Sequence, residues 1–462
     1  MVTDTSTYEA TRQRHVADAL ARLGAQLERL EWTREQILAE QRARLRDVLA
    51  VAKERSPWHR QRLNSIDPAK VTIDGLRSPP VMTKADLMSN WDAIVTDSRL
   101  TLDAAEHHLA NLRSDAYLFD EFHIVASGGS SGKRGVFAWD WEGWSLVYLG
   151  FTRWLLRAAM RTGALESSRT MAIVAAEMPT HMTSAVSQTF TNPATPTHRF
   201  PVTMPVEQIV GALNDLRPTV LSGYPSMLAE LVREADAGRL VIAPRMIVST
   251  SEPLVKDVRD ALQRAWAVPV MNWWGTSEAG PTGSSCGFAD GMHLAEDMMI
   301  VESVDDAYRP VAPGATASRV LLTNLINPLM PLIRYEITDE VTLLDEPCPC
   351  GSQFARVGDI QGRTDDCFVY EGGIVVHPHV LRSPLGRARE VIEYQVRQTP
   401  AGADIDVRCS SGADLGHLER DVAEHLQAVG LRNPAVNVRR VDEIARTAAG
   451  KVARFVPLRR SS

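Results

Sequence analysis

Apolar residues at helical spacing open the chain. Between residues 8 and 63, leucine and isoleucine recur at intervals of three or four positions, with arginine and glutamate between them. This periodicity is typical of amphipathic helices, so we expect a helical lead-in over residues 1–65. Ser56-Pro57 should end the helical pattern, because a residue that precedes proline avoids the helical conformation.

Short apolar runs alternate with helical patterns between residues 120 and 340. This alternation is typical of α/β architecture with a largely parallel sheet. The expected elements are buried strands at residues 171–174, 220–222 and 246–248, and helices at residues 206–216 and 226–237.

The last third of the chain has a different pattern. Apolar runs at residues 320–323 and 341–344 predict hairpins, and the polar, glycine-rich residues 358–366 form a candidate hinge. Beyond them, the order strand, helix, strand predicts a small α+β domain. We therefore place a large N-terminal α/β domain at residues 1–361 and a small C-terminal domain at residues 362–462. The elements expected in the small domain are strands at residues 391–394 and 436–438 and a helix at residues 415–429.

Composition narrows the classes of protein. The chain has 462 residues, more than one simple core usually holds, and its 44% hydrophobic and 23% charged residues are ordinary for a globular protein. The net charge of -7 gives no reason to expect nucleic acid or a membrane surface as a partner. The chain lacks a long apolar run and a secretory signal, and five cysteines are too few for a disulfide framework, so we expect a cytoplasmic protein. The oligomeric state, monomer or homodimer, stays open.

The stretch Ser127-Gly128-Gly129-Ser130-Ser131-Gly132-Lys133 is a candidate polyphosphate-binding loop. It offers backbone N–H groups, hydroxyls and one cation. Lysine is scarce, since 50 residues are lysine or arginine and only six of them are lysine. The stretch is not a P-loop of the nucleotidase type, because Ser127 replaces the first glycine and Arg134 follows the lysine. A flexible linker is the alternative, which we disfavour because strand-like residues 122–125 and 135–138 flank the loop.

Five further polar motifs follow in order, at residues 249–254, 272–278, 334–339, 362–366 and 446–451. Each is weak alone, but the order and spacing of all six are specific. With them the chain resembles the adenylate-forming superfamily of acyl-CoA synthetases and stand-alone adenylation enzymes. Within that superfamily it is most similar to the phenylacetate-CoA ligase family, whose N-terminal signatures residues 56–59 and 80–87 resemble. The resemblance covers the chain from roughly residue 35 to its end.

The resemblance implies the adenylate-forming fold, with a large domain of several α/β subdomains and a small mobile domain. It also implies an AMP-forming acid–thiol ligase that joins a carboxylic acid to ATP, releases pyrophosphate and then forms a thioester with CoA. Transfer of the acyl group to carrier-protein phosphopantetheine or to another nucleophile stays open. We disfavour a non-catalytic relative, because the four residues that such a relative would lose are present: Lys133, Glu278, Asp339 and Lys451.

The resemblance further implies the roles of individual residues. Trp274 stands where the family more often has tyrosine, and it keeps the stacking face; Thr338 stands where glycine often precedes the ribose-binding aspartate. The implied pyrophosphate clamp is Ser127, Gly128, Gly129, Ser130, Ser131, Gly132 and Lys133, and the adenine site is Ser251, Glu252, Pro253, Trp274 and Gly275. In the implied nucleotide site, Ser277 contacts the α-phosphate, Glu278 binds Mg²⁺, Asp339 binds the ribose and Arg363 contacts the nucleotide. In the implied small domain, Asp365 is the hinge, residues 372–378 line the pantetheine tunnel, and Lys451 reaches the α-phosphate and the carboxylate.

The acid pocket is expected near the adenine motif and the segments that follow the first large-domain helices. Its candidate residues are Met178, His181, Tyr224 and Trp273. Methionine and aromatic side chains favour a flat apolar acid, such as an aryl or arylacetic acid.

A separate set of residues suggests a metal site. Cys286, His293, Cys348 and Cys350 offer three thiolates and one imidazole, which suit tetrahedral Zn²⁺ in a closed structural site. The alternative is buried free cysteines with a surface histidine. We favour zinc, and we expect Cys367 and Cys409 to be packing residues.

Overall fold

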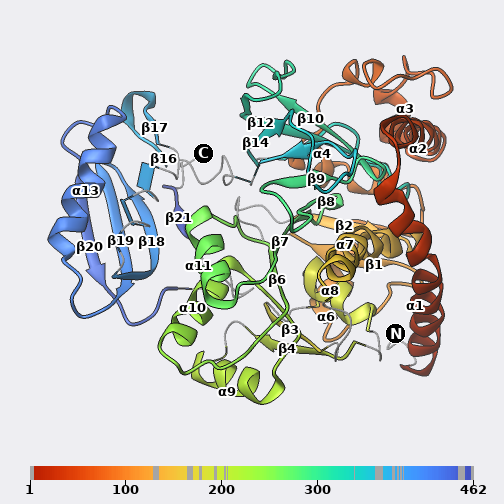
Figure 1. The fold of residues 1–462 in the computed structure, drawn as a ribbon. Helices are drawn as coiled ribbons and strands as arrows, with labels where there is room; N and C mark the ends of the chain where they lie inside the picture. The colour runs from red at the N-terminus through yellow and green to blue at the C-terminus, as the bar shows by residue number, and fades with distance from the viewer. Residues whose placement is uncertain are drawn as a thin grey trace.

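The computed structural model describes residues 5–127, 135–163, 170–175, 179–191, 195–201, 204, 206–337, 339–358, 360, 368–376, 380–381, 384–385, 388, 390–445 and 453–458; the side chains of residues 5–7, 373, 375 and 392 are not included. These residues form a large domain and a small C-terminal sheet domain (Figure 1). No helix in these ranges is both long enough and apolar enough to cross a membrane.

Helices open the chain, as the apolar spacing predicts. A capping box at Thr33 begins the second long helix, and Ser56 ends that helix and caps the next one, which starts at Pro57. The elements of this region are α1 (Thr5–Glu28), η1 (Arg29–Glu31), α2 (Arg34–Arg55), α3 (Pro57–Arg62), η2 (Gly75–Arg77), α4 (Lys84–Ser89), α5 (Trp91–Ile94) and α6 (Leu102–Asn111).

Within the described residues, ten strands form the main sheet in the order β11-β14-β15-β9-β8-β7-β6-β5-β3-β4. The strands from β4 to β7 are parallel, which confirms the expected architecture, and the strands from β7 to β11 pair antiparallel. Their bounds are β3 (Met171–Ala175), β4 (Thr197–Pro201), β5 (Val220–Gly223), β6 (Met246–Thr250), β7 (Val270–Thr276), β8 (Gly280–Ser284), β9 (Met292–Leu294), β11 (Thr316–Ala317), β14 (Val341–Leu344) and β15 (Arg356–Val357).

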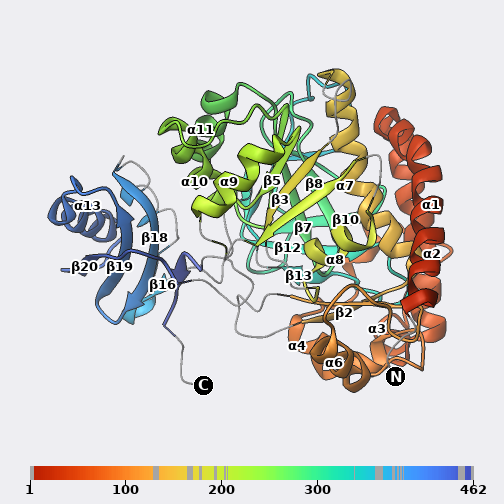
Figure 2. The ribbon, with the colours of Figure 1, turned by 90° about the horizontal axis from the view of Figure 1, so that it is seen from below.

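Helices cover both faces of the parallel strands (Figure 2). Side chains of a strand point alternately to its two faces, so Ile247 packs with α9 (Val206–Leu216), α10 (Pro225–Asp236) and α11 (Lys256–Trp266). Its neighbours Met246 and Val248 pack on the other face with Trp154 of α7. Burial on both faces explains why these strands read as continuous apolar runs. The remaining helices here are α7 (Trp141–Arg161) and α8 (Met182–Thr189).

Two smaller sheets complete the large domain. The hairpin of β1 (His123–Ala126) and β2 (Val136–Trp139) confirms the two strands expected around the candidate loop, of which residues 128–134 lie outside the described ranges. The other sheet contains β10 (Met299–Val304), β12 (Arg319–Asn324) and β13 (Tyr335–Ile337). The expected strands at 320–323 and 341–344 are both present, but they belong to different sheets as β12 and β14.

The small domain has its own sheet and core (blue in Figure 1). Its sheet has the order β20-β19-β18-β21, and helix α13 packs on it through Val422 and Leu426, which confirms the expected α+β domain. The expected hinge, except for Gly358 and Ile360, and the expected boundary after residue 361 lie outside the described residues. The elements are β16 (Phe368–Val369), η4 (Glu371–Gly373), β17 (Val375–Val376), β18 (Val391–Thr399), β19 (Gly402–Cys409), α13 (Leu415–Ala428), β20 (Ala435–Arg440) and β21 (Phe455–Val456).

Candidate functional site

Two of the predicted polar motifs meet at the carboxyl edge of the parallel strands. β6 and β7 run parallel with Thr250 opposite Trp273, so the residues that follow each strand emerge side by side. Open α/β sheets bind ligands at this edge. Residues 251–253 follow β6, and Ser277 and Glu278 follow β7, so both motifs lie where a ligand is expected.

The segment after β6 is shaped by its own side chains. Ser251 has a left-handed backbone with φ of +67°, which is uncommon outside glycine, and its Oγ lies 3.3 Å from Oγ1 of Thr183 in α8. Glu252 accepts a hydrogen bond of 3.0 Å from the backbone N–H of Ser226, in the first turn of α10. The positive end of the helix dipole also stabilises a carboxylate at this position. Since the Glu252 side chain caps this helix, its backbone is the part left for a ligand.

Trp274 and Asp339 are brought together from distant parts of the chain. The indole Nε1–H of Trp274, in β7, donates to Oδ2 of Asp339, beyond β13, over 2.8 Å. Both residues are buried, with 5% and 7% of their surface exposed. A buried carboxylate bonded to a rigid indole has a fixed orientation. The predicted adenine-stacking and ribose-binding residues are therefore direct neighbours.

Glu278 lies in a turn that is held by its neighbours. Thr276 Oγ1 accepts from the backbone N–H of Ala279 over 3.0 Å, and Asn324 Nδ2 donates to the Glu278 carbonyl over 3.1 Å. Its carboxylate is half-buried and has Lys84 Nζ at 3.9 Å. Sequence reasoning did not assign Lys84 to the site, although it is one of the six lysines, and that scarcity is a signal that could have found it.

Tyr335 lies near the same carboxylate. Burial, followed by the charges of Glu278 and Glu336, raises the pKa of the Tyr335 phenol above its ordinary value. The phenol therefore stays protonated. Its hydroxyl is buried and has no hydrogen-bond partner among the described residues, so it is an unused hydrogen-bond donor.

The base of the candidate phosphate loop is closed by Ser127. Its backbone N–H donates to the Gly135 carbonyl over 2.9 Å, and its Oγ accepts from the Gly135 N–H over 2.8 Å. The Ala126 N–H donates to the Thr180 carbonyl over 2.8 Å, which joins this loop to the start of α8. The other predicted site residues that lie outside the described ranges are Gly128, Gly129, Ser130, Ser131, Gly132, Lys133, Met178, Arg363, Asp365 and Lys451.

Aromatic rings lie beside Gly275. Trp273 stacks on Phe151 of α7 at 4.9 Å, and a Cβ on Gly275 would lie 2.6 Å from the end of the Phe151 ring, so a larger residue there would displace this ring. Of the other predicted pocket residues, His181 occupies the N-cap position of α8 and Tyr224 is buried at the start of α10. Phe151 was not predicted, because nothing in the sequence links α7 to the turn after β7.

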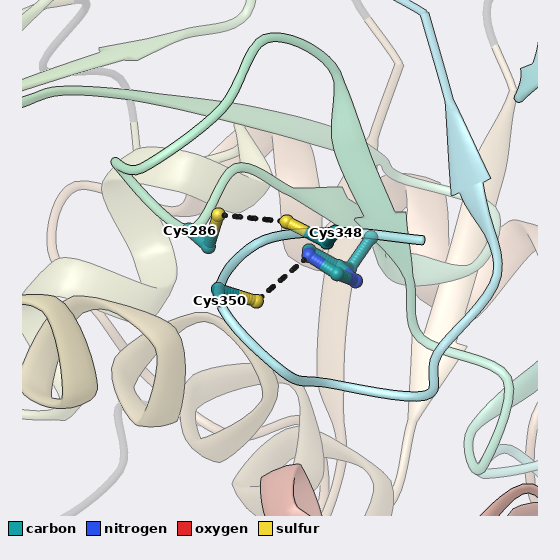
Figure 3. Close-up of side chains that lie close together, drawn as sticks. Cys286, Cys348 and Cys350 are labelled. Carbon is teal, nitrogen blue, oxygen red and sulfur yellow. Dashed lines mark hydrogen bonds between the residues drawn. The ribbon is translucent and has the colours of Figure 1, made fainter. Parts of the chain in front are cut away.

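The predicted metal ligands form one cluster (Figure 3). Cys286, Cys348 and Cys350 converge from the segments around β8 and after β14, and His293 comes from β9. All four residues are buried, and their ligand atoms lie within 4.8 Å of one another. His293 is 1% exposed, so the surface histidine of the alternative interpretation is wrong. Of the two cysteines expected to be packing residues, Cys367 lies outside the described ranges and Cys409 is partly exposed, with its Sγ accepting from Arg440 over 3.3 Å.

Surrounding residues orient this cluster. His293 Nδ1 donates to the Phe354 carbonyl over 3.2 Å, which leaves Nε2 facing Cys350 Sγ at 3.4 Å. The His293 ring also stacks on Trp154 at 4.7 Å. The hydrogen bond between Cys286 and Cys350 lowers the pKa of the Cys350 thiol and raises the pKa of the Cys286 thiol, so Cys350 is the preferred thiolate of the pair. A low thiol pKa favours the thiolate, which is the form that binds metals.

The chain was compared with protein-family models, with curated proteins and with solved structures. No family model matches the chain. It is 29% identical over 224 residues to a phenylacetate-coenzyme A ligase of Thermus thermophilus, an alignment covering 47% of this chain and 48% of that protein. It is 21% identical over 404 residues to Protein CapK of Staphylococcus aureus, covering 84% and 81%. A crystal structure of 2-hydroxyisobutyryl-CoA ligase in the postadenylation state matches with a TM-score of 0.71 at 19% identity, covering 93% and 91%.

The chain has the α/β fold of the adenylate-forming superfamily of CoA ligases, with a large N-terminal and a small C-terminal domain. Phenylacetate-CoA ligases are distant homologues of the chain over about half of its length. The chain likewise spans about half the length of the first of these relatives that it matches.

Proposed function

We propose that the protein is an AMP-forming acid–CoA ligase of the phenylacetate-CoA ligase type. The observation that carries this proposal is the buried Trp274–Asp339 hydrogen bond of 2.8 Å, which starts from β7, the strand that Glu278 follows in the sequence. The fold and the homology to phenylacetate-coenzyme A ligase support it.

The described residues would hold the nucleotide as follows. Adenine would lie between the backbone of residues 251–253 and the ring of Trp274, and the Asp339 carboxylate would accept hydrogen bonds from the ribose hydroxyls. Ser277 would donate its hydroxyl to the α-phosphate. Glu278 offers a hard carboxylate oxygen, which suits Mg²⁺, and its only ion-pair partner among the described side chains is Lys84. When bound, Mg²⁺ would offset negative charge on the phosphates.

Most of the remaining roles fall on residues outside the described ranges. The loop of residues 127–133 would wrap the β- and γ-phosphates, Arg363 would contact the nucleotide, and Lys451 would reach the α-phosphate when the small domain docks. An oxygen of the acid attacks the α-phosphorus, the bond to the β-phosphate breaks and pyrophosphate leaves. The small domain then turns at Asp365, residues 372–378 line the thiol path, and the CoA sulfur displaces AMP from the acyl carbon.

An aryl or arylacetic acid is the substrate class that we propose. The stack of Trp273 on Phe151 beside Gly275 provides flat apolar surfaces next to the position proposed for adenine. The name of the phenylacetate-coenzyme A ligase homologue agrees with such an acid.

We also propose that Cys286, His293, Cys348 and Cys350 hold a structural Zn²⁺. In tetrahedral zinc sites, two sulfur ligands lie about 3.8 Å apart and a sulfur and a nitrogen about 3.6 Å apart. The Cys286–Cys348 and Cys350–His293 separations of 3.6 Å and 3.4 Å fit these values, and 3.6 Å is far too long for a disulfide. Four protein ligands close the site, which indicates a structural role. Metal analysis of untagged protein should find one zinc per chain, and less than half an equivalent would contradict the proposal.

A panel of carboxylic acids tests the ligase function. With ATP and Mg²⁺, at least one aryl acid should release pyrophosphate, and added CoA should yield AMP and a thioester. Pyrophosphate release without a thioester, but with transfer to a phosphopantetheine carrier protein, would identify a stand-alone adenylation enzyme. No pyrophosphate release with any acid would indicate a non-catalytic relative.

A further inference from the structure

Lys84 and Glu278 form an ion pair at the edge of the candidate nucleotide site. Their closest atoms, Nζ and Oε1, lie 3.9 Å apart, and the side chains are 25% and 12% exposed. This distance is too long for a hydrogen bond, so the carboxylate oxygens keep their lone pairs for another ligand. The partial burial limits screening by solvent, so the two charges interact more strongly than a pair on the surface.

The backbone that carries Lys84 is fastened to β13. The Met82 N–H donates to the Arg334 carbonyl over 2.9 Å, and the Glu336 N–H donates to the Met82 carbonyl over 2.8 Å, so Met82 pairs with Tyr335 like a short parallel strand. Thr83 then caps α4 through a capping box, which fixes the start of the helix on which Lys84 is the first residue.

Two arginines, the buried Arg334 and the partly buried Arg62, reinforce this attachment. Arg334 Nη1 donates to the carbonyls of Arg77 and Pro79 over 2.8 and 2.7 Å, and Arg62 Nη2 donates to the Ile333 carbonyl over 2.9 Å. The segment before Lys84 is therefore held on the strand that leads to Asp339. A lysine on so firmly held a segment has a defined position relative to Glu278, unlike a lysine on a free surface loop.

We propose that Lys84 is a positioning residue for the Glu278 carboxylate, supplied by the N-terminal segment of the large domain. This inference rests on the proposed nucleotide-binding function. The ammonium group holds the carboxylate in place and offsets its negative charge, which would otherwise face the phosphates of the nucleotide alone. Lys84 thus acts on nucleotide binding through Glu278.

Calorimetric binding of Mg·ATP, without acid, tests this role separately from catalysis. Lys84→Met should weaken Mg·ATP binding about tenfold, a typical coupling for contacting charged residues. The matched control is Lys256→Met, which removes an exposed lysine paired with Asp260 at 2.7 Å and should bind like the wild type. Lys84→Arg, which keeps the charge, should restore most of the affinity; if Lys84→Met does not fold, Lys84→Gln, which also removes the charge, replaces it and should show the same tenfold loss.

A double-mutant cycle shows whether Lys84 acts through Glu278. In the Glu278→Gln background, Lys84→Met should change Mg·ATP affinity less than twofold, because no carboxylate charge is left to position. An undiminished tenfold loss in that background would overturn the proposal, as would wild-type affinity of Lys84→Met itself. Wild-type protein that binds no Mg·ATP would instead contradict the proposed function. Equal binding by wild type and Lys84→Met would refute only the role of Lys84.

Discussion

The cysteine–histidine cluster and the candidate nucleotide site lie along the same sheet but are built differently. In the cluster, four buried ligand atoms from the large domain lie within 4.8 Å of one another, and Phe354 and Trp154 orient the histidine. At the nucleotide site, the described residues come from α4, from the ends of β6 and β7 and from beyond β13. There the Glu278 carboxylate is half-buried and 3.9 Å from its partner.

This difference separates a closed site from an open one. Four protein ligands, three of them thiols, would leave no position for a substrate, so the cluster suits a structural ion. A hard carboxylate oxygen such as that of Glu278, whose charged partner lies 3.9 Å away, suits an ion that arrives and leaves with a nucleotide. In the proposed function, the open site also needs Lys133 and Lys451, one in each domain, so its completion is expected to require domain closure.

The largest effect is expected from Lys451→Ala, which removes the proposed small-domain cation from the open site alone. We expect adenylation, measured by ATP–pyrophosphate exchange, to fall about a thousandfold, as when a positioned donor to a developing charge is lost. The variant should still convert a preformed acyl-adenylate and CoA to the thioester, and its zinc content should equal that of the wild type. Exchange close to that of the wild type would rule out this role for Lys451.

Cys348→Ser breaks the closed site. We expect it to lose the zinc and to lower the free energy of unfolding by about 3 kcal/mol, measured by denaturant titration, because the loss of a metal site is among the most destabilising changes. Cys409→Ser is the control, since Cys409 lies outside the cluster and is partly exposed. Equal stability of the two variants would mean that the cluster holds no structural ion.

Trp274→Phe keeps an aromatic face but removes the N–H that holds the Asp339 carboxylate at 2.8 Å. We expect ATP binding to weaken about tenfold, the cost of one hydrogen bond to a buried charged group. Trp273→Phe is the matched control, because the neighbouring indole N–H is buried and has no partner among the described residues. If both variants bind ATP equally well, the Trp274–Asp339 bond does not orient the ribose site.

Sequence reasoning predicted elements with a strong apolar pattern and missed contacts between distant segments. The helix at 206–216 and the buried strands β3, β5 and β6 are present where continuous or periodic apolar residues predict them. Two- and three-residue strands such as β15 and β9 are too short to have a period. The metal cluster could be predicted because cysteine and histidine identify it by residue type. The approach of Lys84 to Glu278 could not, since it depends on the pairing of Met82 with Tyr335.

The smallest effect is expected where the small domain contacts the large one. Arg408 of β19 pairs with Glu230 of α10, and Arg233 Nη2 donates to the Val391 carbonyl over 3.4 Å. Arg408→Ala should shift the rates of adenylation and thioester formation by about threefold in opposite directions, because it weakens one of the two proposed domain arrangements. The effect should be small because Glu230 keeps Arg233 as an ion-pair partner at 3.0 Å.

The matched control is Arg439→Ala, which breaks an ion pair of 2.7 Å with Asp406 inside the small domain. High salt should reproduce the effect in the wild type, since it screens partly exposed charges. A change in zinc content or in both rates together would show that Arg408 supports the fold, and the open site would then not depend on this contact.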